Sequence, residues 1–474
     1  MYYRAPEGSV CADVIPFYEN GEFKLFYLKD SRNVEKYGEG TPWCLLTTKD
    51  LVHYVDHGPV LLQGRKEEQD LYVFTGSVFK KTDTYYIFYT GHNPHFVEKG
   101  KNQEKILLAT SKDLLHWEKV KGFEFGPDES WLEPNDFRDP YVFEYDGSYH
   151  MLLAGRMKSD DPINARGVTL IAHSKDLFHW KLDPKPFYEP HAFYTHECPD
   201  LFQIGDFWYF AFSEFTDKQL TTYRIGTTPF GPWKCPKVNT FDGHAFYAAK
   251  SISDGKRRIM FGWDPIKQDE KDDGSWQWGG TIIPHELVQG QDGTLYVKCP
   301  QEILTYYGKE DPFFEKCCFG NAVNKEGNTY HFENEGRNMV AFGKMPTNCR
   351  IDFDFKLEDD AGDFGLLLRM VDAHNEYYVL KLDPKMNRLG FDRSPRGNGY
   401  LHTEVDVERY CPLTLGTIHH LTAIVEGSVL TSYVDERYAL TTRMFDRKEG
   451  DWGIYSLNQD VTYSNLTLRT EAEP

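Results

Sequence analysis

The chain has 474 residues, of which 53 are basic and 73 acidic, giving a formal net charge of −20. A chain of this length can bury a large core and form two or three domains without disulfide support. It contains no run of Lys and Arg of the kind that follows a phosphate backbone, and no apolar stretch long enough to cross a bilayer. These features argue against nucleic-acid and membrane partners.

Five similar segments recur along the first two thirds of the chain, each followed by a strand rich in aromatic and aliphatic residues. Turn dipeptides such as Asn20-Gly21 and Asp146-Gly147 are typical of tight hairpins. Self-similar units of short strands predict a β-propeller, here with five four-stranded blades over about residues 1–305. The five segments are Asp13–Gly21, Thr75–Asp83, Asp139–Gly147, Glu197–Gly205 and Tyr247–Gly255.

A second motif, Lys-Asp-Leu-x-His followed by an aromatic residue, occurs three times, with its aspartates 63 residues apart at Asp50, Asp113 and Asp176. Its Asp and Ser or Thr suit a tight turn, and its Leu and aromatic residue suit packing between blades. We therefore interpret this motif as structural.

From about residue 313 the repeats stop and apolar and polar residues alternate instead. The alternation predicts strands at 350–359, 364–372, 376–383, 419–436 and 463–470, and hence an antiparallel β-sandwich domain over residues 313–474. The whole chain is thus predicted to be all-β. We expect the sandwich to brace the propeller, with carbohydrate binding as the alternative.

Three of the five segments begin with an acid, since Asp13, Asp139 and Glu197 each stand eight positions ahead of a glycine. Thr75 and Tyr247 hold the same place in the other two segments, so the fold itself does not need an acid there. In a closed ring, residues at one place in each blade point at a common axis. The three carboxylates are therefore expected to meet in one active site.

Two carboxyl groups across a glycosidic bond can cleave it, one as the acid and the other as nucleophile or base. Asp139 follows Arg138, whose guanidinium is expected to keep it ionised for binding sugar hydroxyls. Glu197 has the longest of the three side chains and suits the acid, while Asp13 suits the nucleophile.

The chain resembles glycoside hydrolase family 32, which holds the β-fructofuranosidases. The resemblance rests on Asp13, Arg138-Asp139-Pro140 and Glu197-Cys198-Pro199 in that order, together with Trp43 and the segments 74–77, 246–248 and 278–284. It implies a five-bladed propeller followed by a β-sandwich, and a retaining double displacement on sucrose or short fructo-oligosaccharides. In this mechanism Asp13 attacks C2 of the fructosyl unit, and Glu197 protonates the leaving oxygen and then activates water. Retention implies carboxyl groups about 5 to 5.5 Å apart.

The first motif departs from the family pattern Trp-Met-Asn-Asp-Pro-Asn-Gly, because this chain reads Ser-Val-Cys-Ala-Asp-Val-Ile-Pro. Leu28 and Leu45 also stand where the family commonly has Gln and His. The fructose pocket must therefore be rebuilt, and the preferred fructoside stays open. Trp263 and Trp276 are further aromatic candidates for this pocket. The predicted substrate-binding residues are Arg138, Trp43, Phe74, Thr75, Tyr247, Trp278 and His92.

Three alternatives share this architecture: a fructosyltransferase, an inverting pentosidase of the arabinanase type, and a non-catalytic sugar-binding propeller. No metal or organic cofactor is expected. The start of the chain carries no export signal, and the nine scattered cysteines include no C-x-x-C pair, so a cytoplasmic protein with reduced thiols is expected. The sequence does not decide whether the chain forms a homo-oligomer through the sandwich domain.

Overall fold

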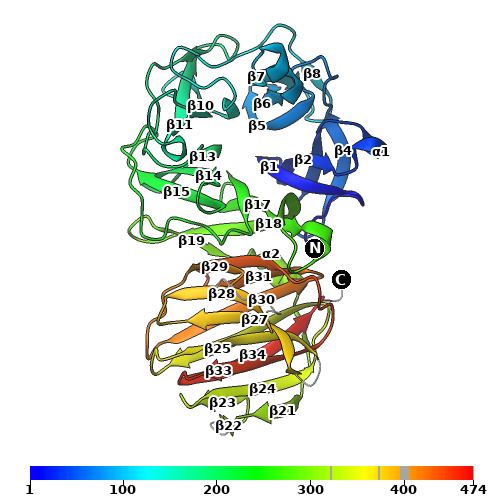
Figure 1. Cartoon of the computed structure of the whole chain (residues 1–474), viewed down its shortest axis with the longest axis vertical. Helices are drawn as coiled ribbons and strands as arrows, with labels where there is room; N and C mark the ends of the chain where they lie inside the picture. The colour runs from blue at the N-terminus through cyan, green and yellow to red at the C-terminus, as the bar shows by residue number, and fades with distance from the viewer. Residues whose placement is uncertain (321–322, 372–373, 396–404, 473–474) are drawn as a thin grey trace.

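The computed structural model describes residues 1–320, 323–371, 374–395 and 405–472. It consists of a ring of five β-sheet blades and a two-layer β-sandwich that packs beside the last blade, as Figure 1 shows. The predicted fold class, an all-β five-bladed propeller followed by a sandwich, is confirmed.

The blades follow one another in chain order, and each runs from an inner to an outer strand. Blade one has β1 (Ser9–Glu19), β2 (Glu22–Ser31), β3 (Trp43–Thr48) and β4 (Val55–Leu61), and blade two has β5 (Tyr72–Lys81), β6 (Thr84–His92), β7 (Glu104–Ser111) and β8 (Trp117–Lys119). Blade three has β9 (Arg138–Tyr145), β10 (Ser148–Arg156), β11 (Gly167–Ser174) and β12 (Lys181–Leu182), and blade four has β13 (Glu197–Ile204), β14 (Phe207–Glu214) and β15 (Leu220–Gly226). Blade five has β16 (Tyr247–Ser253), β17 (Arg258–Lys267), β18 (Trp276–Gln289) and β19 (Leu295–Lys298).

Blade four differs from the predicted four strands. Its outer edge is completed only by isolated bridges, from Thr222 to Thr240 and from Ile225 to Lys234. The connecting segments of the chain contain the short helices α1 (Val34–Tyr37) and α2 (Gln301–Tyr306) and the 3-10 helices η1 (Pro94–Lys99), η2 (Ile163–Ala165) and η3 (Gln268–Glu270).

The ring closes through its innermost strands. Each of β1, β5, β9 and β13 contacts the innermost strand of the next blade, and β16 contacts β1 again. The long strand β18 also pairs with β1, with Cys11 opposite Gly280, so blades five and one share a hydrogen-bonded sheet. Closure leaves only short, protected sheet edges at the axis and directs the first residues of all five inner strands toward one place.

The repeated Lys-Asp-Leu motif has the structural role expected of it. Asp50 Oδ1 accepts hydrogen bonds from the backbone N–H groups of Val52 and His53, at 3.1 and 2.8 Å, and the copies at Asp113 and Asp176 do the same. The following leucines are buried with positive φ in all three turns. The motif therefore caps a tight turn and anchors it in the core.

The sandwich consists of two antiparallel sheets. One contains β20 (Lys309–Asp311), β22 (Val323–Glu326), β23 (Thr329–Phe332), β25 (Asn348–Leu357), β30 (Ile418–Glu426), β31 (Val429–Val434), β32 (Tyr438–Arg443) and β34 (Val461–Thr470). The other contains β21 (Glu315–Phe319), β24 (Arg337–Lys344), β26 (Asp363–Val371), β27 (Glu376–Asp383), β28 (Arg388–Ser394), β29 (Val407–Tyr410) and β33 (Asp451–Leu457).

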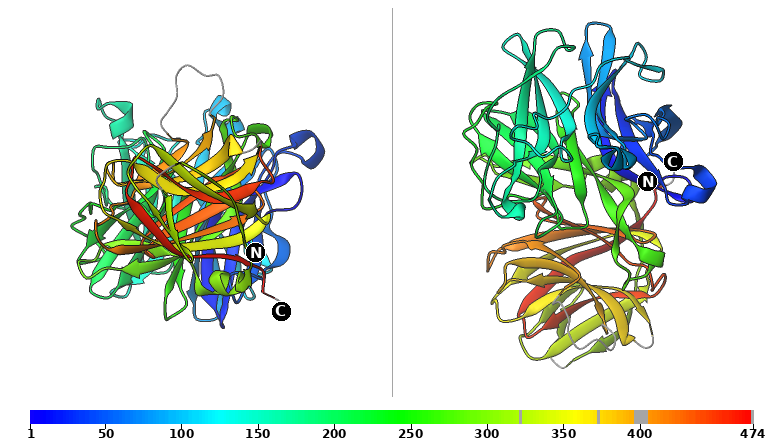
Figure 2. Two further views of the ribbon diagram at one scale, coloured as in Figure 1. Left: turned by 90° about the horizontal axis from the view of Figure 1, so that it is seen from below. Right: turned by 45° about the horizontal axis from the view of Figure 1, so that its top comes forward.

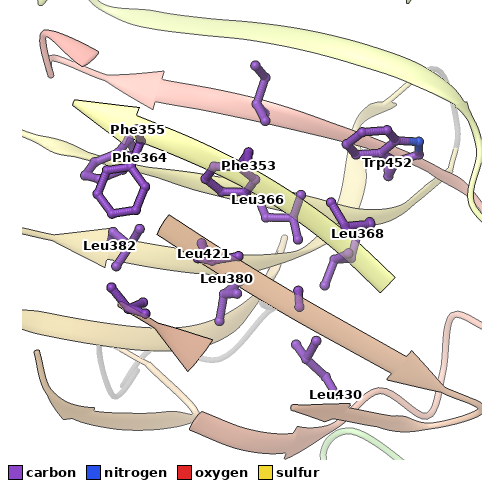
Figure 3. Packing of buried hydrophobic residues seen from close by; sticks show 14 of the residues in the cluster. Phe353, Phe355, Phe364, Leu366, Leu368, Leu380, Leu382, Leu421, Leu430 and Trp452 are labelled. Carbon is purple, nitrogen blue, oxygen red and sulfur yellow. The ribbon is translucent and has the colours of Figure 1, made fainter. Parts of the chain in front are cut away.

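Inward-facing side chains of both sheets fill the space between them, because alternate residues of a strand point to the same face. Figure 3 shows Phe353, Phe355 and Leu421 of one sheet beside Phe364 and Leu380 of the other, all of them fully buried. The alternation seen in the sequence is thus the pattern of a half-buried strand.

The sandwich packs against blade five, as Figures 1 and 2 both show. Apolar side chains of β30 to β32 join the core of blades four and five. Buried polar contacts cross the same junction: Arg443 pairs with Asp264 at 2.8 Å, and Asp242 binds His285 at 2.9 Å and the Thr441 hydroxyl at 2.6 Å. The two parts are therefore joined by an extensive, specific interface.

Strand β20 pairs with β34, so hydrogen bonding within the sandwich begins just ahead of residue 313. The division into domains at 1–305 and 313–474 stays a prediction. Among the described residues, no helix has both the length and the apolar character needed to span a bilayer.

Candidate active site

Each innermost strand carries a β-bulge near its start. The pairing of β1 with β2 skips Asp13, and that of β5 with β6 skips Thr75. The inner strands of blades three, four and five each fit two residues opposite one, and there Asp139, Cys198 and Ala248 have φ values of 62°, 51° and 51°. Left-handed backbone in non-glycine residues is costly and concentrates at functional sites. The bulges therefore mark a common ring of residues at one end of the propeller.

Glu197 does not hold the same place as Asp13 and Asp139, which corrects the expectation from sequence. In blades one and three the glycine is the second turn residue, whereas Gly205 is the first, because Ile204 pairs with Phe207. The strand pairing therefore aligns Glu197 with Arg138, and Cys198 with Asp139. Glu197 still reaches the site, since it directly precedes the bulge.

A cavity of about 430 Å³ opens at this end of the ring, and a cavity of this size can hold a small sugar. Eight of the ten predicted site residues line it: Asp13, Phe74, Thr75, Arg138, Asp139, Glu197, Tyr247 and Trp278.

Asp13 is held by donors from two neighbouring blades. Its Oδ2 accepts a hydrogen bond from the Thr75 hydroxyl of blade two, and its Oδ1 accepts one at 3.0 Å from the Trp263 indole N–H of blade five. Burial raises the pKa of Asp13, and the two donors act against this rise. A carboxylate with both oxygens fixed in this way is oriented for attack on a bound molecule.

Glu197 is held by two other side chains. Arg138 Nη2 donates to its Oε1 at 2.9 Å, and the Tyr247 hydroxyl donates to its Oε2 at 2.7 Å. The side chain keeps 21% of its surface exposed, so it remains accessible from the cavity. It is thus positioned but not sealed, as a group that exchanges protons with a ligand must be.

Asp139 lies deeper, with 3% of its surface exposed. Its Oδ2 accepts a hydrogen bond from the Cys198 N–H at 2.8 Å, and its own N–H donates to the Thr90 hydroxyl at 2.8 Å. Burial raises the pKa of Asp139 to about 7, although Arg138 lowers it.

The expectation that Arg138 keeps Asp139 fully ionised is therefore wrong. The Arg138 guanidinium donates hydrogen bonds to Glu197 at 2.9 Å, to Asp136 at 3.0 Å and to Glu104 at 3.4 Å. The charge of Arg138 still lowers the pKa of Asp139, but burial and the neighbouring acids Glu197 and Asp13 outweigh it.

Two predicted substrate-binding residues do not line the cavity. Trp43 is completely buried, and its indole N–H donates to the backbone carbonyl of Phe74 at 3.2 Å. His92 stacks on the Phe74 ring with centroids 4.7 Å apart and lies 3.3 Å from Glu104. Trp43 and His92 therefore both contact Phe74 without lining the cavity themselves. Trp276, a further aromatic candidate, packs against the sandwich core and His244 instead.

The cavity also contains residues that the sequence reasoning missed. Asp136 lies in the segment just ahead of β9, two positions before Arg138, and pairs with the Arg138 guanidinium. Tyr194 lies in the connection between blades three and four and Phe215 lies in the β14–β15 loop, and no repeat marks either residue. The missed lining residues are Gln103, Glu104, Asn135, Asp136, Tyr194 and Phe215.

A buried lysine lies beneath the carboxyl groups. Lys250 of β16 is 2% exposed, and its Nζ donates to the carbonyl of Gly76 at 2.9 Å. Burial lowers its pKa, while Asp139 and Asp13 raise it, so the lysine and these acids share one electrostatic environment. Within the described part of the chain, no group of three or more His, Cys, Asp or Glu side chains has the arrangement of a metal site.

A closed five-bladed propeller with carboxyl groups gathered at one end, joined to a β-sandwich, is an architecture of glycoside-cleaving enzymes. The chain belongs to glycosyl hydrolase family 32: the model of the family's N-terminal domain matches residues 14–299, and that of its C-terminal domain matches residues 322–470. The first match begins one residue after Asp13, in keeping with the unusual sequence around that residue.

Curated relatives and solved structures agree with this assignment. Raffinose invertase of Escherichia coli is 28% identical over 62% of this chain and 63% of its own, and a probable sucrose-6-phosphate hydrolase of Psychromonas ingrahamii is 26% identical over 91% and 74%. The chain spans only 54 to 63% of the length of the first curated relatives. Fructan 1-exohydrolase IIa of Cichorium intybus is similar in fold over 100% of this chain and 97% of its own, with a TM-score of 0.74 and 17% identity.

Proposed function

We propose that the protein is a retaining β-fructofuranosidase that removes terminal fructosyl units from sucrose or short fructo-oligosaccharides. The observation that carries the proposal is the meeting of Asp13 and Glu197 in one cavity, each held by different donors. Membership of family 32 supports the same activity, as do relatives named for the hydrolysis of raffinose, sucrose 6-phosphate and fructans.

In the proposed reaction, Asp13 attacks C2 of the fructosyl unit while Glu197 protonates the leaving oxygen. The bond from C2 to the leaving oxygen breaks, and an ester between Asp13 and the fructosyl unit forms. Glu197, now a carboxylate, takes a proton from water, whose oxygen attacks C2 and releases Asp13. Each displacement inverts C2, so the product retains its configuration.

The surroundings of the two acids support these roles. Donors to both oxygens of Asp13 stabilise its charged form and orient it, as a nucleophile requires. Tyr247 and Arg138 hold Glu197 at the cavity wall, where it can reach a leaving group. Asp139 lies beside them, and its carboxyl is suited to binding ring hydroxyls as donor or acceptor, because its pKa of about 7 allows either form near neutral pH.

Two pairs of aromatic residues are proposed to flank the sugar. Phe74 and Trp278, with ring centroids 6.2 Å apart, lie on the Asp13 side and supply an aromatic surface in place of the missing tryptophan of the first motif. Tyr194 and Phe215, with ring centroids 5.7 Å apart, come from the segment just ahead of Glu197 and from the β14–β15 loop of the blade of Glu197. Since Glu197 protonates the leaving oxygen, the second pair is assigned to the leaving sugar.

The test is turnover and product analysis. The purified protein is expected to release fructose from sucrose and 1-kestose, with β-fructofuranose as the first product in NMR spectra taken within seconds of mixing. Asp13→Ala and Glu197→Ala are each expected to remove nearly all turnover with the fold intact, and Asp139→Asn to be severely impaired. Near wild-type rates for Asp13→Ala would contradict the proposed nucleophile.

The same assay separates the alternatives. An α-configured first product, or cleavage of aryl arabinofuranosides in place of fructosides, would indicate the inverting pentosidase. Fructosyl transfer to sugar at high sucrose concentration would indicate the transferase. Binding without turnover by the wild type would indicate a non-catalytic sugar-binding protein.

A cytoplasmic location and a bracing role of the sandwich complete the proposal. All nine cysteines carry free thiols, which is typical of proteins kept in a reducing compartment. The buried contacts of Asp264 and Asp242 with the sandwich support bracing. Association of identical chains through the sandwich is tested by the mass of the protein in solution.

A further inference from the structure

The lining of the catalytic cavity is strongly acidic. It includes five carboxyl groups, those of Asp13, Asp139, Glu197, Glu104 and Asp136, and one guanidinium, that of Arg138. With Glu197 protonated, as the proposed reaction requires, the four other carboxyl groups still outnumber three cations, namely Arg138, Arg156 beside Asp136 and Lys250 beneath the acids. The cavity wall therefore has an excess of negative charge.

The Arg138 guanidinium is already saturated by these acids. It pairs with Glu197 at 2.9 Å, Asp136 at 3.0 Å and Glu104 at 3.4 Å, and only 12% of its side chain is exposed. Glu104 is held as an anion, because Arg138 and His92 lower its pKa more than burial raises it. An anionic ligand would have to displace one of these acids to reach Arg138.

The other cations near the site are also engaged. Arg156 pairs with Asp136 at 2.7 Å, and its guanidinium lies over the Tyr194 ring at 4.5 Å. Arg32, which donates to the carbonyl of Trp278, pairs with Asp30 at 2.8 Å. Lys250 lies below the cavity, buried and bound to a backbone carbonyl. Each of these cations is already bound to an acid or to a backbone carbonyl of the protein itself.

We infer that this cavity selects uncharged fructosides and discriminates against fructosides that carry a phosphate group, such as sucrose 6-phosphate. The inference deepens the proposed function and rests on it, since it names the substrate class of the same site. A sugar phosphate carries a charge of about −1.5 to −2 at pH 7, and proteins recognise it with Arg, Lys or helix N-termini. Here it would meet carboxylates instead.

The repulsion acts throughout the cavity. Charges are screened over about 8 Å at physiological ionic strength, which is comparable with the width of a cavity this small. A phosphate group bound within the cavity therefore lies within range of its acidic wall. Uncharged hydroxyls, by contrast, can donate to the same carboxylates.

The experiment compares sucrose with sucrose 6-phosphate as substrates of the full chain. We expect kcat/KM for sucrose 6-phosphate to be at least tenfold lower at low salt. Added salt should narrow this difference, because it screens the phosphate from the wall and leaves sucrose unaffected. Asn135→Lys adds a cation to the cavity wall and should reduce the ratio of kcat/KM for sucrose to kcat/KM for sucrose 6-phosphate at least threefold. The matched uncharged variant Asn135→Gln should leave this ratio unchanged.

The outcomes distinguish this inference from the proposed function. Equal or faster cleavage of sucrose 6-phosphate overturns the charge argument and leaves a fructosidase. The charge argument is also overturned if neither added salt nor Asn135→Lys changes the ratio of the two kcat/KM values. If no fructoside is cleaved, the proposed function fails. The charge argument is then tested by calorimetry, which measures the affinity of the wild type for sucrose and for sucrose 6-phosphate. Tighter binding of sucrose 6-phosphate than of sucrose overturns the charge argument.

Discussion

Replacing Thr75 with Val tests how the proposed nucleophile is kept ionised. The change keeps the size and branching of the side chain but removes the hydroxyl that donates to Asp13 Oδ2. Burial raises the pKa of Asp13, and Thr75 is the strongest of the groups that lower it. Loss of the hydroxyl must therefore raise the pKa of Asp13 further, and the variant must lose its nucleophile as pH falls sooner than the wild type does.

The size of the effect follows from the bond that is lost. A hydrogen bond to a charged group contributes about 1.5 to 3 kcal/mol, which at about 1.36 kcal/mol per pKa unit predicts a rise of about 1 to 2 units. We expect the acidic limb of the kcat/KM profile on sucrose to move to higher pH by this amount. The maximum of the profile should fall less than its acidic side.

Two further variants make the interpretation specific. Trp263→Phe removes the donor to the other oxygen of Asp13 and should move the acidic limb in the same direction. Thr222→Val removes a buried hydroxyl that donates to the carbonyl of Asn239, away from the cavity, and should leave the limb in place. An acidic limb that moves in neither Thr75→Val nor Trp263→Phe would refute the assignment of Asp13 as the ionised nucleophile.

Three further predictions concern the other acid, the leaving sugar and the domain junction. Tyr247→Phe removes a 2.7 Å hydrogen bond to Glu197 and should lower kcat about tenfold or more, measured at saturating sucrose. Tyr194→Ala should raise KM for sucrose several-fold with a smaller change in kcat, whereas Phe230→Ala, which alters an exposed ring outside the cavity, should change neither. Arg443→Met strips buried Asp264 of its cation and should cost about 3 to 5 kcal/mol in urea unfolding, most of it recovered by adding Asp264→Asn. Burial already raises the pKa of Asp264 to about 7, so the folded protein binds a proton at this carboxyl more tightly than the unfolded chain does. The loss of stability in Arg443→Met should therefore be largest above that pH, where Asp264 is charged. A loss of stability that does not depend on pH would contradict this account.

Much of the fold could be predicted because its signals are local. Alternating apolar residues and hairpin dipeptides are set by the two-residue period of a strand and by backbone sterics, and these act within a few residues. The three-fold recurrence of Asp50, Asp113 and Asp176 gave the blade spacing, and the structure confirms those residues as turn caps. The outer strand of blade four was harder to predict, because the outer edge of this blade has only isolated bridges.

The site could be predicted as a set of residues but not as a set of contacts. The motif acids Asp13, Asp139 and Glu197 do line one cavity, yet a one-residue difference in the turn at Gly205 shifts Glu197 relative to the other two. Trp43 shows the same limit of prediction from sequence. The sequence is the same whether the tryptophan ring faces a ligand or, as in this protein, lies in the core.

The amino-acid sequence by itself determined the all-β architecture, the number of blades and the acids at the starts of the inner strands, because each depends on periodicity and turn chemistry along the chain. Only the tertiary structure decided that Arg138 binds Glu197, that Thr75 and Trp263 hold Asp13, and that burial raises the pKa of Asp139. These properties depend on which side chains from distant blades meet and how much water they exclude. Ring closure sets both, and no local stretch of sequence records it.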